Sequence, residues 1–356
     1  MPLPLLAATD SGEALEQLHR LGCTDGLPVV IPTRERVDRL VLASGLPGDL
    51  VLGSMGPAGG AASVEQLATS AVMAGCLPEH MPVVVAAVEA VIDPLFDLLE
   101  MQATTHCTAP LILVNGRARA DCGPLASGFG ALGPGNRANA SIGRALRLAM
   151  INIGGGRAGE SDMALLGHPG KFTYCLAEDE ESSPFEPLHE SLGFARDSSV
   201  VTVVGAEAPH SVISIVDADD PESAPRLLTS LASCLANPGS NNAVLRGGSA
   251  VVVLNPDHAA LLADAGYDRA RIRSELHERA SFLPAELARY VRVADDIDPG
   301  RIYSFASPED ILVLVAGGGG LYSMVMPSWC AGPHRNAAVS KEIRIGEWCA
   351  VPSGSS

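Results

Sequence analysis

The sequence predicts an α/β fold with mixed or parallel sheets flanked by helices. Short apolar runs of strand length end in glycine or asparagine turns, as at Asn115-Gly116. Segments with helical spacing lie between them, and this alternation continues through the whole chain. The expected strands are Leu111–Val114, Lys171–Leu176, Ser199–Gly205, Ser249–Leu254 and Ile311–Val315.

Two short sequence patterns that each occur twice in the chain suggest two similar α/β halves. A Pro-acid-His triplet begins a helix at Pro78 and again at Pro256, and apolar strands end in glycine turns at Gly116 and Gly317. Helices that begin with proline are common, so this is weak evidence of duplication. The predicted division is an N-terminal half, 1–198, with the glycine-rich loop and helix, a C-terminal half, 199–350, and a polar tail, 351–356.

Local signals place several helix ends. Ser63 and Gln66 match the capping-box pattern, so a helix should begin there. Thr33 and Asn255 are expected to cap helices, with Pro256 in the first helical position. Pro94 should kink or break the apolar helix that follows Pro78.

Composition excludes several functions. The chain has 356 residues and a net charge of −17, which argues against nucleic acid or an anionic membrane as a partner. Its eight cysteines show no C-x-x-C spacing, so we expect reduced cysteines and a cytoplasmic location. The N-terminus has no basic start typical of a secretory signal, and no apolar run approaches the roughly 18 residues of a membrane span.

A glycine-rich loop leads into a helix near the middle of the chain. Gly128, Gly130, Gly133 and Gly135 precede a segment in which Ile142, Leu146 and Ile153 share one helical face. Free N–H groups at such a helix start can bind an anion, although the same pattern also fits a plain turn. The predicted substrate-binding residues are Asn136, Arg137, Asn139, Gly133 and Gly135, with Asn241 and Asn242 from a later polar loop.

We expect the loops after the strands to meet at one edge of the sheet, because parallel strands with right-handed crossovers end there. The loops concerned contain Asn115, 133–139, 178–181, 207–210 and 317–320. Their shared edge is the reason for predicting one pocket.

Histidines, carboxylates and one lysine are the candidate chemical groups. The predicted catalytic residues are His106, His210, Glu178, Glu180 and Lys171, and in one alternative Glu207 or another carboxylate orients His210 as a general base. His106, His210 and Glu181 could instead bind a divalent metal ion, zinc or iron, although no H-x-H or H-E-x-x-H spacing is present. Cys107 and Cys330 are weaker candidates for a nucleophile, since a lone cysteine is usually a small core residue.

Several segments resemble a known but poorly characterised bacterial family. They are TDGLPVV, AVMAGCLPEHMPVV, QATTHCTAPLILVNG, GALGPGNRANASIGRALRL and GAEAPH. Together they are similar to the large chains found with, or fused to, the UGSC-type (seleno)protein domain. The resemblance implies a small thiol or selenol protein as a partner, but no U-G-S-C or C-G-S-C motif occurs here. It places Cys107 at a variable position and implies no particular reaction.

The sequence thus favours an enzyme that acts on a small polar or anionic metabolite by a hydrolase- or lyase-type step. One alternative is a redox subunit that works with a thiol or selenol protein, and another is a non-catalytic binding or scaffold subunit. A homo-oligomer is compatible with each hypothesis.

Overall fold

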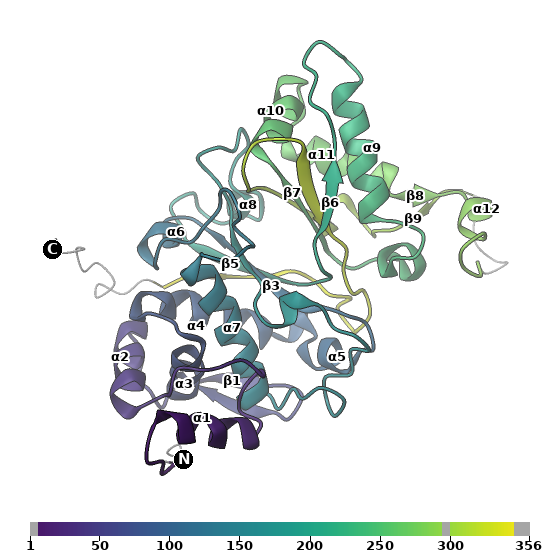
Figure 1. Cartoon of the computed structure of the whole chain (residues 1–356). Coiled ribbons are helices and arrows are strands. Elements are labelled where there is room, and N and C mark those ends of the chain that lie inside the picture. The colour runs from purple at the N-terminus through teal and green to yellow at the C-terminus, as the bar shows by residue number, and fades with distance from the viewer. Residues whose placement is uncertain (1–5, 294–299, 345–356) are drawn as a thin grey trace.

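The computed structural model describes residues 6–293 and 300–344 and has an α/β architecture (Figure 1). The longer helices are α1 (Ser11–Arg20), α2 (Arg34–Ser44), α3 (Val64–Ala74), α4 (Met81–Val91), α7 (Arg137–Asn152), α9 (Ser223–Leu235), α10 (Pro256–Asp264) and α11 (Arg269–Arg279). Short helices are α5 (Leu98–Ala103), α6 (Ala118–Asp121), α8 (Leu188–Ser191) and α12 (Pro284–Leu287). Single turns are η1 (Pro78–His80), η2 (Pro94–Phe96), η3 (Pro169–Lys171), η4 (Asn242–Arg246) and η5 (Pro308–Asp310).

Within the described residues, the strands form two four-stranded sheets and two small antiparallel pairs. The first sheet has the order β12 (Val339–Glu342), β5 (Val200–Ala206), β3 (Ala109–Asn115), β4 (Cys175–Ala177). The second has the order β10 (Ile311–Val315), β7 (Ala250–Leu254), β11 (Tyr322–Met326), β6 (His210–Ile213). The small pairs are β1 (Val51–Met55) with β2 (Gly60–Ser63) and β8 (Ser281–Phe282) with β9 (Ile302–Tyr303).

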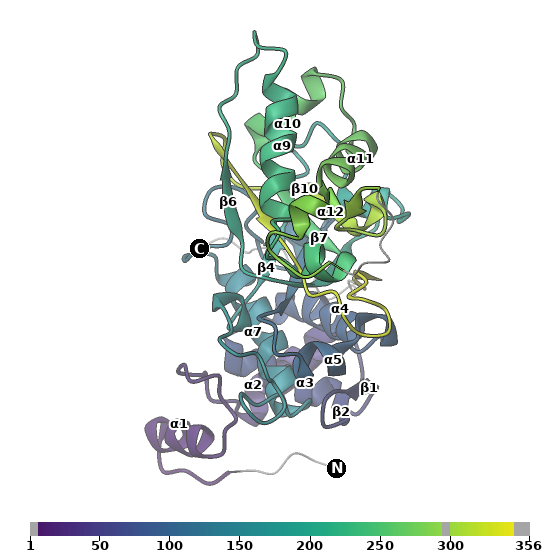
Figure 2. The same ribbon diagram turned by 90° about the vertical axis from the view of Figure 1, so that its right-hand side faces the viewer.

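The two large sheets lie face to face between two layers of helices. Leu111 and Val204 of the first sheet share one apolar cluster with Val251 and Leu314 of the second. The other face of the first sheet packs on α3, α4 and α7, and the other face of the second on α9, α10 and α11. Figures 1 and 2 agree that the N-terminal helices and the C-terminal helices lie at opposite ends of the molecule. Every residue of β3, β5, β7 and β10 is buried, which explains their unbroken apolar sequences.

The two sheets have the same topology and register. In each, a central strand pairs in parallel with one neighbour and antiparallel with the other, which pairs antiparallel with an outer strand. One row across the first sheet is Cys175, Ile112, Val203 and Val339, and the matching row across the second is Val313, Val252, Val325 and His210. The chain therefore contains two topologically equivalent halves.

The outer strands are exchanged between these halves. β6 follows β5 of the first sheet but pairs in the second, and β12 follows β11 of the second sheet but pairs in the first. The sheets thus divide after Ala206, not at 198/199, and β12 returns to the N-terminal half. The repeated sequence patterns do not correspond to the equivalence of the two halves. Gly116 follows β3, whereas Gly317 follows β10, which is the equivalent of β4. The polar tail, 351–356, lies outside the described residues.

Most of the local signals act as expected. Ser63 and Gln66 form the capping box of α3, and Thr33 and Asn255 accept backbone N–H groups at the starts of α2 and α10. The helix after Pro78 ends at Val91, before Pro94. The segment Lys171–Leu176, expected as a strand, instead begins with the end of η3, and β4 starts only at Cys175. Within the described ranges, no helix is both long and apolar enough to cross a bilayer.

Candidate active site

The strand exchange brings four segments together, and we call this region the exchange site. The crossing segments are 207–209, between β5 and β6, and 327–338, between β11 and β12. They meet where Ala206 pairs with Ser328 and the Glu207 N–H donates to the Pro327 carbonyl at 2.9 Å. The segments that lead into β3 and β7, 104–108 and 241–249, belong to the same region.

A histidine–carboxylate pair lies in this region. His106 Nε2 lies 2.9 Å from Glu207 Oε1, and the two side chains are 22% and 30% exposed. When Nε2–H donates a hydrogen bond to Glu207, the lone pair of the neutral ring is on Nδ1. His106 Nδ1 is buried and has no hydrogen-bond partner among the described residues. An oriented imidazole with one uncommitted nitrogen has the form of a general acid–base group.

The backbone around this pair is fixed on both sides. Tyr174 Oη donates to the Glu207 carbonyl at 2.8 Å, while the His106 N–H donates to Thr104 Oγ1 at 3.2 Å. Since Glu207 directly follows β5 and His106 precedes β3, the antiparallel pairing of Ala109 with Ala206 brings them together. The pair is therefore a consequence of sheet register rather than of a flexible surface contact.

Segment 162–167 runs beside the segment that carries His106. The Met163 N–H donates to the Gln102 carbonyl, Leu165 N–H to the Thr105 carbonyl, and Gly167 N–H to Cys107 Sγ. The Gln102 amide, which is buried, has no partner for either of its polar atoms in the described part of the chain.

A compact ion network adjoins this segment. Lys171 Nζ lies 2.6 and 2.7 Å from the two Asp162 oxygens, and Arg147 Nη1 lies 3.4 Å from Oδ2. Burial lowers the pKa of Lys171, an effect that its hydrogen bond to Asp162 opposes, and Cys107 acts electrostatically on the same ammonium group. Burial also lowers the pKa of Arg147, whose Nη2 is buried without a partner within the described ranges. Asp162 and Arg147 were not among the sequence candidates.

His168 has a structural role next to the pair. Its Nδ1 accepts the Gly170 N–H at 3.1 Å, so Nε2 carries the proton that it donates to the Ala206 carbonyl at 3.2 Å. Burial lowers the pKa of His168 to about 4, which keeps the ring neutral near pH 7. The ring therefore fixes the end of β5 at the residue before Glu207.

The predicted residues Asn241 and Asn242 also lie at the exchange site. Asn242 Oδ1 accepts the Ser328 N–H at 2.9 Å, and its Nδ2 donates to the Gly247 carbonyl at 2.8 Å. The Asn241 carbonyl accepts from Cys330 Sγ at 3.2 Å. Burial raises the pKa of the Cys330 thiol to about 11, so it is a poor source of thiolate.

The three predicted acidic residues lie at the other end of the first sheet. Glu178 contacts Asn115 Nδ2 at 2.5 Å and Arg269 Nη2 at 3.2 Å, and is fully buried. Glu180 and Glu181 both pair with Arg119, which lowers the pKa of Glu181 to about 2. Because β3 spans seven residues, this end lies about 20 Å from His106.

The single edge predicted from the sequence is thus split in two, because β5 runs antiparallel to β3. Glu207 and His210 follow β5 and lie at the end where β3 begins, whereas Glu178 follows the parallel strand β4. His106, His210 and Glu181 therefore do not form the predicted metal site. Across the described residues, no group of three or more His, Cys, Asp or Glu side chains is arranged to hold a metal ion.

The glycine-rich loop keeps its polar groups in internal bonds. Asn136 Nδ2 donates to the Gly130 carbonyl, Arg137 to the Gly75 carbonyl, and Asn139 bonds both backbone groups of Ala126. The Gly133 N–H donates to the Gly130 carbonyl, and Gly135 has a φ of 98°. The structure does not bring this loop to the His106–Glu207 pair, so binding of an anion there stays a prediction.

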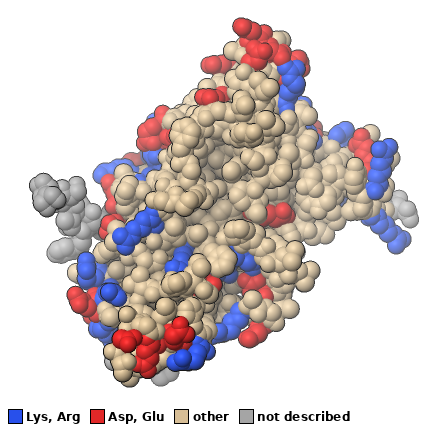
Figure 3. Space-filling model, viewed as in Figure 1, with Lys and Arg blue, Asp and Glu red and all other residues tan. Residues whose placement is uncertain are grey.

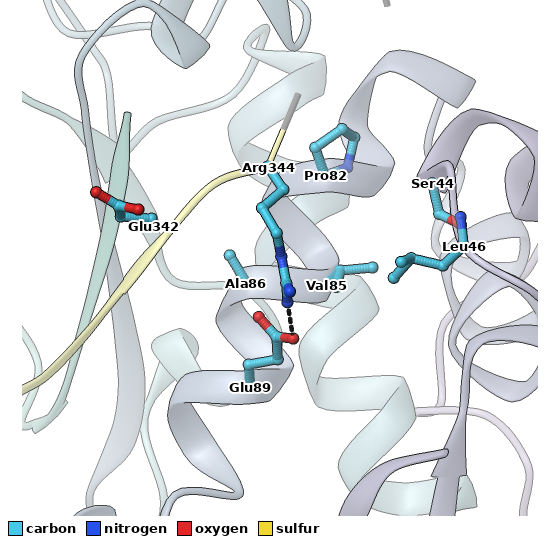
Figure 4. Close-up of a pocket in the computed structure, with 8 residues that line it drawn as sticks. All are labelled: Ser44, Leu46, Pro82, Val85, Ala86, Glu89, Glu342 and Arg344. Carbon is cyan, nitrogen blue, oxygen red and sulfur yellow. Dashed lines mark hydrogen bonds and ion pairs between the residues drawn. The ribbon is translucent and has the colours of Figure 1, made fainter. Parts of the chain in front are cut away.

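Figures 3 and 4 show the charges on one face of the protein and a pocket in the structure. The upper centre of the face in Figure 3 is almost free of charged side chains, whereas blue and red patches lie at the margins and across the lower half. Figure 4 shows a small pocket away from the exchange site, where α4 and the residues after β12 meet. Arg344 pairs with Glu89 at its wall, so these two charges neutralise each other.

Comparisons with protein-family models, curated proteins and solved structures find no match to this chain. The resemblance noted in the sequence therefore stays a prediction, and the functional argument rests on the exchange site.

Proposed function

We propose that this protein is an enzyme in which His106, oriented by Glu207, is the general acid–base residue of a hydrolase- or lyase-type step. The observation that carries the proposal is the 2.9 Å contact between His106 Nε2 and Glu207 Oε1, which leaves Nδ1, a buried atom of a partly exposed ring, uncommitted. The two residues are 101 positions apart and come together only through the fold. A substrate or water molecule that reached Nδ1 would give it a hydrogen-bond partner.

The surrounding groups favour a small polar or anionic substrate. Arg147 Nη2 and Gln102 Nε2 are buried donors without partners in the described chain, and Gln102 Oε1 is a similar acceptor. Buried polar groups that lack a partner are costly, commonly by about 1–3 kcal/mol each. A ligand with a carboxylate and a hydroxyl or amino group offers the complementary acceptors and donors.

We place this reaction in the cytoplasm. Among the described residues, seven cysteines are free, which fits a reducing compartment. Cys107 lies beside Lys171 but is not assigned a covalent role, because its Sγ already accepts the Gly167 N–H at 3.2 Å.

The test is a calorimetric screen of the purified protein against small hydroxy acids, amino acids, amides and lactones, followed by variants at the pair. His106→Asn should lower kcat by at least about 100-fold on any substrate found, with the circular dichroism spectrum unchanged. If His210 were the base instead, His210→Gln would cause that loss and His106→Asn would not. Failure of every compound in the screen, or full turnover by His106→Asn, would remove the proposal.

A further inference from the structure

A second histidine–carboxylate pair lies at the exchange site. Asp97 Oδ1 contacts His334 Nδ1 at 2.8 Å, and Oδ2 accepts the backbone N–H of His334 at 2.7 Å. The Asp97 side chain is 2% exposed, whereas that of His334 is 39% exposed. The buried carboxylate thus fixes a more exposed imidazole and leaves Nε2 as the nitrogen that it does not hold.

Backbone strain is concentrated around this pair. Four non-glycine residues within the described ranges have a positive φ, and they are Asp97, Arg246, Arg335 and Asn336. Arg335 Nη2 donates to the carbonyl groups of Leu245 and Arg246, while the Asn336 side chain bonds both backbone groups of Gly205. Such conformations persist only where the surrounding structure enforces them, and they gather at functional sites.

A glycine allows the crossing segment to close over the carboxylate. A Cβ at Gly332 would lie 2.7 Å from Asp97 Oδ2 and 2.8 Å from Trp329 Cη2, and Gly332 has a φ of 87°. Any other residue would push the segment away from Asp97. The fold therefore holds His334 in one defined position.

The two pairs flank one short helix. Asp97 is the N-cap of α5, and His106 follows its last residue, Ala103, by three positions. The helix of six residues rises about 9 Å, so only a short stretch of chain separates the two pairs. The crossing segment links them as well, since Pro327 accepts from Glu207 and Cys330 interacts electrostatically with Glu207.

We propose that His334, positioned by Asp97, is a second catalytic residue of the same active site and protonates an oxygen or nitrogen leaving group. This inference rests on the proposed function of His106. In a hydrolytic step, His106 Nδ1 removes a proton from water as the water oxygen bonds to the substrate carbon and the bond from that carbon to the leaving group breaks. In a lyase step, it removes a proton from a substrate carbon, and the electron pair of that C–H bond forms a double bond to the neighbouring carbon as the leaving group departs. His334, in its imidazolium form with Nδ1–H bonded to Asp97, gives the Nε2 proton to that group, and solvent then returns a proton to His334 and takes one from His106.

The experiment compares His334→Gln, Asp97→Asn and His106→Asn on a substrate from the screen. We expect His334→Gln to lower kcat by at least about 100-fold with KM changed by less than about threefold. The pH–rate profile of His334→Gln should also no longer depend on a protonated acid group. A purely structural role of His334 would not produce this change. A substrate with a better leaving group should recover most of the lost kcat.

The outcomes separate the two proposals. If His106→Asn is inactive while His334→Gln keeps wild-type kcat and pH profile, the role of His334 is wrong and the proposed function stands. If His106→Asn keeps full activity, the proposed function fails first. Should His334→Gln fail to fold, diethyl pyrocarbonate on the wild-type protein replaces it, with modified histidines located by mass spectrometry. Inactivation that follows modification of His334 supports the role, and full activity after its complete modification overturns it.

Discussion

Ala206 and Ser328 hold equivalent positions in the two halves and pair with each other in antiparallel fashion. Val203 in β5 and Val325 in β11 occupy equivalent positions in the two sheets. Ala206 lies three residues after Val203, and Ser328 lies three residues after Val325. Antiparallel pairing of equivalent residues is what a local two-fold axis between them produces. The axis passes through the exchange site, so segments from both halves surround the His106–Glu207 pair.

Replacement of Glu207 by glutamine should impair catalysis without unfolding the protein. Glutamine can still accept a hydrogen bond from His106 Nε2, but it no longer stabilises the imidazolium form. We expect kcat to fall by about 10- to 1,000-fold, as measured on the substrate from the screen. Glu160→Gln, at an exposed position, removes the same charge and is the matched control. Equal kcat values in the two variants would contradict the role of Glu207.

Replacement of Asp162 by asparagine should destabilise the fold. Asp162 is the shared counter-ion of Lys171 and of buried Arg147, and its loss leaves both cations without a carboxylate. Removal of one partner from a buried ion network commonly lowers the free energy of unfolding by about 3–5 kcal/mol. Because Lys171 is partly exposed, we expect a loss at the lower end of this range. Urea unfolding measures the change. A second substitution, Lys171→Met, should recover part of the loss, and no recovery would show that the two side chains are not coupled.

The sequence predicts the elements well but not their pairing. Ser63, Thr33 and Asn255 cap helices as expected because capping depends on a few adjacent residues. The direction of β5 could not be predicted, since a buried apolar strand has the same composition in parallel and antiparallel pairs. That direction separates Glu178 from Glu207.

Two parts of the candidate site could not be predicted from the sequence, for related reasons. The exchange of β6 and β12 joins segments more than 100 residues apart, so no local spacing reports it. Asp97 and His334 are likewise 237 positions apart. The sequence signal for this second pair is weak. His334 follows Gly332-Pro333, and Asp97 follows a turn that contains proline. Glycine and proline favour special backbone conformations.

Stability should fall as the pH drops from about 6.5 to about 4, in part through His80. This residue is 1% exposed, and burial lowers its pKa to about 4. Because the unfolded chain has the higher pKa, it binds the proton more readily in this window, and acid favours unfolding by up to about 3 kcal/mol. His168 acts in the same direction. Urea unfolding across this range measures the effect, and His80→Gln should flatten it. An unchanged pH dependence in His80→Gln would show that His80 does not contribute.

The buried pair of Glu178 and Arg269 should couple the two halves at the end opposite the exchange site. Glu178 follows β4 in the first half and Arg269 begins α11 in the second, and their side chains are 0% and 2% exposed. Glu178→Gln leaves a buried guanidinium without its carboxylate, so we expect a loss of about 3–5 kcal/mol in urea unfolding.

Removal of both charges should cost less than the sum of the single losses. In Glu178→Gln with Arg269→Met, neither charge is left unpaired, so the double-mutant cycle should give a coupling energy above about 1 kcal/mol. Asp121→Asn, which breaks the more exposed pair with Arg117, is the control and should cost at most about 1 kcal/mol. Additive losses in the cycle would mean that Glu178 acts through Asn115 Nδ2 and the Leu188 N–H alone, since both already donate to Oε2. The ion pair would then not be what joins α11 to the first sheet.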